Sequence, residues 1–193
     1  MNRQIPEFTK VGGGYLDTHG IENFYNAAAN NDFARTNLFR VTRIGDQRFD
    51  AGELLYAEST TLPGRSITNI QVPFMGLVFN VPGTATYNNS GAYNITFRIP
   101  QGLSIRRKFE QWSRQIFNDV DSSGDYSIPS TSIANQMEIV LIDKKGAALR
   151  VYTFYGVYCQ NIGDITLDIT TAGEIMKQQV TLAFQYWRLS PLS

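Results

Sequence analysis

The segment DVDSSGDYSIPS, residues 119–130, holds the most regular arrangement of possible metal ligands in the chain. Its oxygen-bearing side chains at alternate positions are Asp119, Asp121, Ser123 and Asp125. With Gly124 at the sixth place, this spacing is typical of an EF-hand calcium loop, which ends in a bidentate Glu at the twelfth place. The twelfth residue here is Ser130, and a strand pattern follows where an EF-hand needs a helix. The loop is therefore a weak metal candidate, and a polar surface loop is the favoured interpretation.

Few other residues offer catalytic or metal-binding chemistry. One cysteine, Cys159, excludes an internal disulfide and a cysteine-based zinc site. One histidine, His19, removes most Ser-His, Cys-His and multi-histidine arrangements. The sequence contains no P-loop, no dinucleotide fingerprint, no zinc-protease motif and no nucleophile elbow. We expect no catalytic residue, no cofactor, no metal and no enzymatic activity.

Length and charge also limit the function. The chain has 193 residues and a formal net charge of zero, so it fits one domain with no general attraction to nucleic acid or to an anionic membrane. The basic residues of segment 103–117 are interpreted as a solvated helix face rather than a nucleic-acid patch, because Glu110 lies among them. No apolar run has the length of a signal peptide or a membrane span, so we expect no membrane anchor and synthesis in a cytosolic environment.

Alternating apolar and polar residues predict about eight or nine strands. The clearest pattern is residues 92–99, where Tyr93, Ile95 and Phe97 share one face. Near the end of the chain, residues 165–169 and 174–189 are predicted to form two further strands.

Helical periodicity is strong in one place. Residues 104–117 carry one apolar stripe, and Ser104 is placed to cap that helix. A short helix is predicted at residues 21–32, after a glycine-containing arm at residues 1–20. Few helices are available to connect parallel strands. We therefore predict a mainly β fold, an antiparallel β-barrel or sandwich with one flanking helix, as a single domain over residues 21–193.

Four quoted segments share the order and character of a known family. They are NNDFARTNLFRVTRI at 30–44, STTLPGRSITNIQVPFMG at 59–76, RRKFEQW at 106–112 and NIGDITLDITTAGEIMKQQVTLAFQYW at 161–187. Together the segments resemble the tail tube protein of T4-like contractile-tailed bacteriophages. The resemblance spans most of residues 20–189 and says nothing about the N-terminal arm or the loop at 119–130.

The resemblance implies a structural protein of the virion. Such proteins form homohexameric rings that stack into a hollow tube inside a contractile sheath, and genomic DNA passes along the lumen. Related tubes occur in type VI secretion and in pyocin-like particles. The implied partners are further copies of the chain, the tail sheath protein, the baseplate and tail terminator proteins, and the tape measure protein and transiting DNA in the lumen. Stable sequence-specific binding of nucleic acid is not expected.

By the same analogy, a hairpin around residues 45–75 should reach a neighbouring subunit or the next ring. Its expected contact residues are Leu62, Pro63, Ile67, Ile70, Val72, Phe74 and Met75. The alternative is that these residues form the core of the domain. A sheet facing a watery lumen needs a polar outer face. The alternation gives these candidates for it: Asn94, Thr96, Arg98, Gln179, Thr181 and Gln185.

Two other functions remain open at this point. One is a tube initiator or tail-completion protein on the baseplate side with the same fold, although the modest length favours the repeating subunit. The other is a calcium-binding module built on a β-sandwich, against which Ser130 and the missing exit helix argue.

Overall fold

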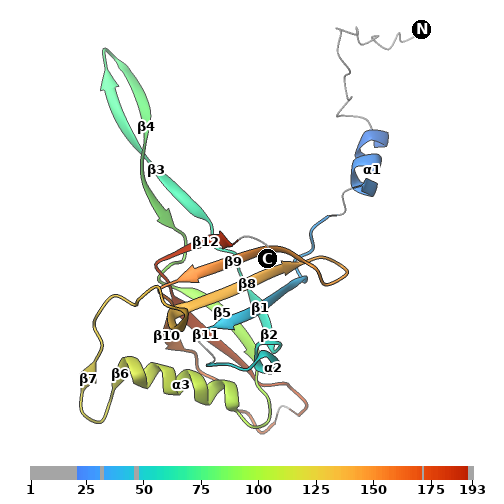
Figure 1. Ribbon diagram of the computed structural model, residues 1–193, viewed down its shortest axis with the longest axis vertical. Coiled ribbons are helices and arrows are strands. Elements are labelled where there is room, and N and C mark those ends of the chain that lie inside the picture. The colour runs from blue at the N-terminus through green and yellow to red at the C-terminus, as the bar shows by residue number, and fades with distance from the viewer. Residues whose placement is uncertain (1–20, 31–32, 46–47, 171, 191–193) are drawn as a thin grey trace. The chain divides into compact units, whose positions relative to one another are not determined.

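A computed structural model describes residues 21–30, 33–45, 48–170 and 172–190 (Figure 1). The chain divides into two units, residues 1–37 and 38–193. The first unit contains helix α1 (Ile21–Asn30), and the Phe24 and Phe33 rings pack with centroids 6.1 Å apart. The predicted arm at residues 1–20 and its boundary lie outside the described residues.

The second unit is built on two antiparallel sheets of four strands each. The β8 sheet has the order β1 (Phe39–Ile44), β8 (Gln136–Ile142), β9 (Ala148–Tyr155), β12 (Tyr186–Ser190). The β5 sheet has the order β10 (Tyr158–Ile162), β11 (Lys177–Ala183), β5 (Tyr93–Arg98), β2 (Ala57–Thr60). The mainly β, antiparallel prediction is confirmed, and the described strands form open sheets in a sandwich-like arrangement rather than a closed barrel.

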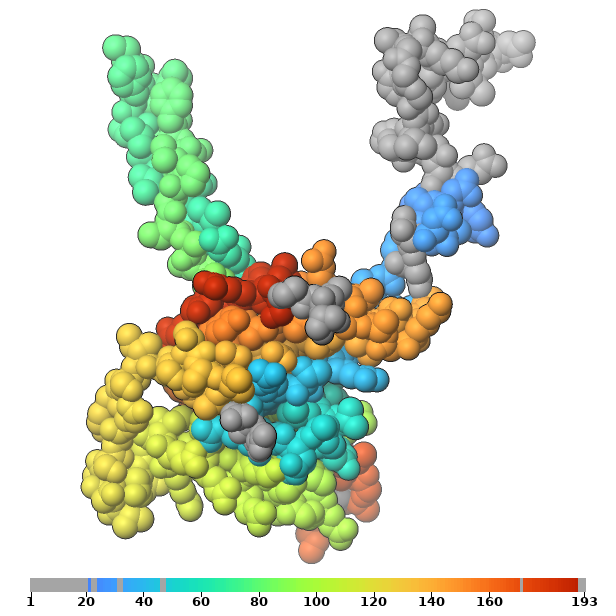
Figure 2. Space-filling model, in the orientation of Figure 1, coloured from blue at the N-terminus to red at the C-terminus, as the bar shows by residue number. Residues whose placement is uncertain are grey.

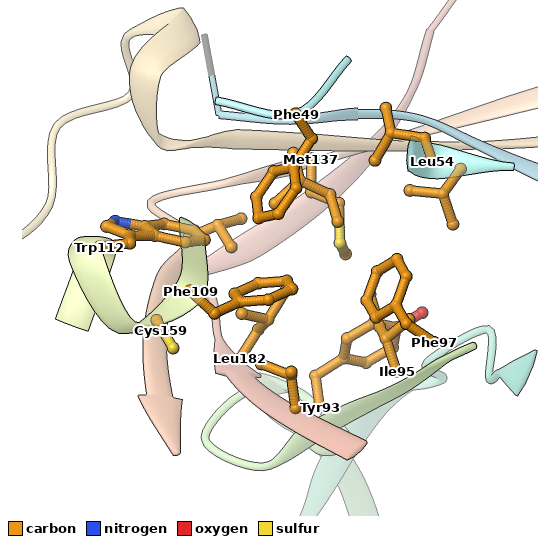
Figure 3. Close-up of a cluster of buried hydrophobic side chains, with 14 of the residues drawn as sticks. Phe49, Leu54, Tyr93, Ile95, Phe97, Phe109, Trp112, Met137, Cys159 and Leu182 are labelled. Carbon is orange, nitrogen blue, oxygen red and sulfur yellow. The ribbon is translucent and has the colours of Figure 1, made fainter. Parts of the chain in front are cut away.

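Alternation along the strands sends apolar side chains to one side and so builds the core. Tyr93, Ile95 and Phe97 of β5 are fully buried, as the pattern predicted, and so are Met137 and Ile139 of β8. Figure 3 shows Tyr93, Ile95, Phe97 and Met137 converging in one cluster with residues of the neighbouring helix, and Ile139 belongs to the same cluster. Because each buried residue alternates with a more exposed one, the outer faces of the sheets carry most of the polar side chains.

Helix α3 (Ser104–Ile116) matches the predicted helix to within one residue. Its Ile105, Phe109 and Trp112 are buried, which confirms the stripe. Phe109 lies within the cluster near Phe49 and Leu182 (Figure 3), with its ring centroid 4.6 Å from that of Phe49. The predicted cap is wrong, because the helix begins at Ser104 itself and the preceding residue provides no side-chain cap.

Shorter elements complete the second unit. They are helix α2 (Ala51–Leu54), the strand pair β6 (Phe117–Asn118) and β7 (Ser123–Gly124), and the 3-10 helix η1 (Ile133–Asn135). A separate antiparallel hairpin consists of β3 (Arg65–Phe74) and β4 (Leu77–Tyr87).

Two predicted strands are wrong. Residues 165–169 form no strand. The single strand predicted at 174–189 is instead two strands, β11 and β12, which belong to different sheets. The division follows from the backbone, because Phe184 N–H donates to the Ser90 carbonyl and Gln185 N–H donates to the Tyr155 carbonyl. Side-chain alternation continues across such a transfer, so it left no signal in the sequence.

Candidate assembly surfaces

The β3–β4 hairpin is closed by a tight two-residue turn. Met75 and Gly76 have φ values of 46° and 81°, and positive φ at both central residues is the conformation that matches the right-handed twist of flanking strands. The predicted hairpin range of residues 45–75 is therefore wrong, because the hairpin runs from Arg65 to Tyr87. Figure 1 shows it as a two-stranded ribbon separate from both sheets.

The register divides the outer part of the hairpin into two faces. The apolar face, named so from here on, is made of the pairs Phe74–Leu77, Val72–Phe79 and Ile70–Val81. The opposite face is made of the pairs Pro73–Val78, Gln71–Asn80 and Asn69–Pro82. All six side chains of the apolar face are between 44% and 64% exposed. Figure 2 shows the hairpin (green) as a narrow projection from the rest of the second unit.

Two prolines explain why no third strand pairs with this hairpin. Counting from the two-residue turn, Phe74–Leu77 is a hydrogen-bonded pair, so Pro73 and Pro82 fall at non-hydrogen-bonded pairs. The nitrogen of each proline then faces outward and offers no N–H to a further strand. The edges are poor templates for pairing, and the apolar face is the part of the hairpin left for contact.

The predicted interface residues fall into two groups. Ile67, Ile70, Val72, Phe74 and Met75 are exposed on the hairpin, and Leu62 is exposed just before it. Pro63 is buried within the chain. The alternative interpretation as domain core does not hold for the exposed residues of this set.

Sequence reasoning missed half of the apolar face. Leu77, Phe79 and Val81 are absent from the expected contact residues, because the predicted hairpin range stops at residue 75. Their alternation mirrors that of β3 about the Met75–Gly76 turn, and this symmetry about a possible two-residue turn is the signal that could have found them.

The outer face of the β5 sheet collects five of the six predicted lumen residues. The register sets Asn94 opposite Thr181 and Thr96 opposite Gln179 on adjacent strands. The Thr181 hydroxyl donates to Asn94 Oδ1 at 2.8 Å. Arg98 lies on the same face opposite Lys177. This face is a continuous polar surface, uncharged at Asn94, Thr96, Gln179 and Thr181 and charged where Arg98 and Lys177 lie.

One carboxylate joins the two cations of that face. Arg98 and Lys177 are directly opposite each other, where like charges destabilise a strand pair. Glu58 of β2 bridges them, since its Oε1 accepts from Lys177 Nζ at 2.6 Å and its Oε2 lies 3.4 Å from Arg98 Nε. The hydrogen bond from Lys177 holds the pKa of Glu58 below its usual value.

The sixth lumen candidate, Gln185, lies elsewhere. It follows β11, outside both strands of the polar face, and its side chain passes close to Gly156. It lines a cavity together with Trp112 at the C-terminal half of α3.

The candidate calcium loop uses its carboxylates locally. Asp121 Oδ1 accepts from the Ser123 N–H at 3.0 Å and from the Ser123 hydroxyl at 2.6 Å. Asp125 Oδ1 accepts from the Ser127 N–H at 3.0 Å. The hydrogen bonds from these serine side chains lower the pKa of both carboxyl groups. Within the described part of the chain, no cluster of three or more acidic, histidine or cysteine side chains could hold a metal ion.

The remaining reactive groups have no site around them. Cys159 is buried, and burial raises the pKa of its thiol to about 12, so it is a poor nucleophile. His19 lies outside the described residues. No described helix has the length and apolarity to cross a bilayer.

The family model for phage tail tube protein matches residues 26–190. The chain belongs to the phage tail tube protein family. It is a structural protein of the virion and not an enzyme.

Individual relatives agree with the family. Tail tube protein gp19 of Enterobacteria phage T4 is 27% identical over 172 residues, which cover 86% of this chain and 98% of gp19. The gp19 protein of Enterobacteria phage T6 is 26% identical over the same coverage. A chain in the sheath and tube terminator of an extracellular contractile injection system shares the fold, with a TM-score of 0.58 and 16% identity over 83% of this chain and 99% of that one. The resemblance read from the four segments is confirmed.

Proposed function

We propose that this tail tube protein assembles into hexameric rings that stack into the inner tube of a contractile tail, and that the tube is the conduit for genome delivery. The observation that carries the proposal is the apolar face of the β3–β4 hairpin. Six apolar side chains on one face of a two-stranded ribbon are about half exposed in the single chain. A contiguous exposed apolar patch of this kind marks a surface that another protein covers.

A second copy of the chain is the partner that this face fits. The two prolines blunt the hairpin edges, so the face can pack on a neighbour without the edges recruiting further strands. Covering the face removes apolar area from water at about 25 cal/mol per Å², and repetition around a closed ring and between rings would bury it in every copy. The expected contact residues are Ile70, Val72, Phe74, Leu77 and Phe79.

The chemistry of the polar face of the β5 sheet suits the wall of the lumen. Its Asn94, Thr96, Gln179 and Thr181 offer amides and hydroxyls, with little charge to hold DNA. The sheet ends on both sides in edge strands, β2 and β10, each of which contains a register irregularity. We expect β2 of one copy to join β10 of the next, which would close six sheets into one barrel and remove the free edges.

Other parts of the tail would contact the outside and the ends of this tube. One structural neighbour of this fold belongs to a sheath–tube complex in its extended state, with a TM-score of 0.53 and 16% identity. By analogy, the proposed partners are a sheath protein on the outer surface, baseplate and terminator proteins at the two ends, and a tape measure protein and DNA inside.

The test compares two neighbouring positions on β3. Val72→Glu places a charge on the apolar face, and Gln71→Glu places the same charge one residue away on the opposite face. The purified full-length variants are examined by negative-stain electron microscopy and sedimentation velocity. We expect Val72→Glu to raise the protein concentration needed for rings or tubes by about tenfold or more, because the buried charge costs more than 1.4 kcal/mol per contact. Gln71→Glu should assemble as the wild type does.

Thermal melting separates assembly from folding. Both residues are exposed on the hairpin, so the Tm of the unassembled chain should change little in either variant. Tubes of normal yield from Val72→Glu would refute the role of the apolar face. Absence of six-fold rings from wild-type protein at every concentration, with and without a baseplate extract as nucleator, would refute the proposed assembly.

A further inference from the structure

A cavity of about 450 Å³ lies beside the C-terminal half of α3, under the loop at residues 125–129. It is distinct from the apolar face and from the polar face of the β5 sheet. Its main polar and aromatic lining residues are Arg48, Trp112, Gln115, Asn135, Tyr158 and Gln185.

Arg48 is the one cation in the lining of this cavity. Its guanidinium carbon lies 4.8 Å from the centre of the Trp112 ring. Its Nη1 donates to Gln115 Oε1 at 2.6 Å, while its Nε is buried and has no hydrogen-bond partner among the described residues. Stacking on an indole and one bond to a neutral amide hold the guanidinium plane in place without neutralising it.

Two glycines let the side chains lie where they do. Gly45 has φ 68°, and a Cβ there would come within 2.7 Å of Arg48 Cδ. Gly156 has φ 66°, and a Cβ there would come within 2.6 Å of Gln185 Cγ. The Arg48 and Gln185 side chains therefore pack directly against the backbone of these glycines. A larger residue at either glycine would push the side chain away. Two of the lining residues of the cavity are therefore held by close contact with the backbone.

The charge of Arg48 has no counter-ion among the described residues. Asp125 also lines the cavity, but its Oδ1 is used by the Ser127 N–H, and no ion pair joins it to Arg48. Burial lowers the pKa of Arg48. The one hydrogen bond of the guanidinium goes to the neutral amide of Gln115, so a carboxylate in the cavity would add the charge-assisted hydrogen bond that this cation lacks among the described residues.

We propose that this cavity binds a carboxylate carried by a partner chain, an Asp or Glu side chain or a C-terminus, with Arg48 as its principal ligand. A phosphate fits less well, because one cation faces its two charges and Asp125 adds a third negative charge nearby. The aromatic and apolar walls formed by Trp112, Tyr126 and Ile128 suit a residue of a folded or extended partner segment better than a free ion.

The test uses Trp112 as the reporter. In the Trp187→Phe background of the full-length chain, Trp112 is the only tryptophan. The probe is acetyl-Gly-Glu-Gly-amide, and its matched control is acetyl-Gly-Gln-Gly-amide. We expect a saturable change in Trp112 fluorescence with the Glu peptide, with half-saturation on the order of 1 mM, and binding of the Gln peptide at least about tenfold weaker. Inorganic phosphate should also bind more weakly than the Glu peptide.

Variants decide whether Arg48 is the ligand. Arg48→Gln should abolish the response to the Glu peptide, and Arg48→Lys should weaken it about tenfold, because an ammonium lacks the planar fork. Asp125→Asn should leave binding intact or strengthen it, since it removes a like charge. Equal responses to the two peptides, or an unchanged response in Arg48→Gln, would overturn the proposal. A response to the Glu peptide that appears only in Asp46→Asn would also overturn the proposal. The site would then already be filled by a carboxylate of the same chain. Circular dichroism melting confirms that each variant is folded.

The source of the carboxylate is read from assembly. Loss of tubes in Arg48→Gln would assign the carboxylate to a neighbouring copy, and tubes of normal yield would assign it to a chain outside the tube, such as a sheath protein. This assignment rests on the proposed tube function, whereas the peptide titration does not, so the two can fail separately.

Discussion

Phe97 on β5 and Phe109 on α3 are both fully buried, with ring centroids 5.6 Å apart. The same strand carries Asn94 and Thr96 on its other face, where they lie opposite β11. One strand therefore holds the helix on its inner side and part of the polar face on its outer side. In a tube whose lumen is lined by the β5 sheet, α3 would lie on the side of that sheet away from the lumen.

The first prediction concerns this contact. Phe109→Ala should lower the free energy of unfolding by about 3–5 kcal/mol, because it removes a fully buried ring from the packing of Phe49 and Phe97. Urea denaturation followed by circular dichroism measures the loss. Arg107→Ala, on the exposed side of the same helix, is the control and should change stability by less than about 0.5 kcal/mol. Equal, small losses in the two variants would show that the core does not hold α3.

The sequence predicted the parts of the fold in which periodicity and burial agree. The stripe of α3 and the alternation of β5 each belong to an element with one dry face and one wet face, and both are confirmed. The four quoted segments also carry enough of the family pattern for the sequence alone to indicate a tail tube protein.

The parts it did not predict are those in which contacts with other chains or a change of sheet decide the structure. The apolar face of the hairpin is exposed in the single chain, and its second half, at Leu77, Phe79 and Val81, lies beyond the predicted hairpin range of residues 45–75. Residues 165–169 alternate like a strand, yet Leu167 and Ile169 are exposed in a loop. Arg48 was not singled out at all, because nothing in its sequence neighbourhood shows that it would stack on Trp112.

The second prediction concerns alkaline pH. Burial raises the pKa of Tyr93 to about 12, although hydrogen bonds with Thr60 and Thr61 act in the opposite direction. The folded chain thus holds this proton more tightly than the unfolded chain, whose tyrosine pKa is about 10. The contribution to stability is complete below about pH 10 and is lost as pH rises toward 12. The stability of the wild type should therefore fall more steeply over this range than that of Tyr93→Phe.

Urea unfolding at several pH values between 8 and 12 measures this difference, with absorbance at 295 nm to follow ionisation. At neutral pH, Tyr93→Phe should cost about 1 kcal/mol for the lost hydrogen bonds. Tyr126→Phe is the control, because Tyr126 is 84% exposed and should leave the alkaline profile unchanged. Parallel profiles for wild type and Tyr93→Phe would mean that Tyr93 ionises freely in the folded chain.

The third prediction concerns calcium. The Tm of the chain should be the same in about 1 mM calcium and in excess chelator, because Asp121 and Asp125 accept hydrogen bonds from Ser123 and Ser127 and the twelfth residue of the loop is Ser130. A site with a Kd one hundred times below the calcium concentration would stabilise the chain by about 2.7 kcal/mol and raise the Tm by several degrees. A rise of that size, absent in Asp121→Asn, would restore the loop as a calcium site.

The last prediction concerns the direction in which the hairpin points. The register of β3 and β4 shifts between Ile67 and Asn69, and Thr68 Oγ1 accepts from the Thr84 N–H at 3.0 Å at this irregularity. A Cβ at Gly83 would lie 2.8 Å from Thr68 Oγ1 and 3.0 Å from the Thr68 carbonyl oxygen. Gly83→Ala should therefore push the strands apart and turn the apolar face away from its partner.

Tube yield by electron microscopy and Tm by circular dichroism test this together. We expect Gly83→Ala to lose tubes while its Tm stays within about 2 °C of the wild type, because the outer hairpin adds no side chain to the buried core. Gly91→Ala is the matched control, since a Cβ there meets nothing within 4 Å. A Gly83→Ala variant that assembles normally would show that the hairpin adapts to its partner when it binds, so that the bulge does not set its direction.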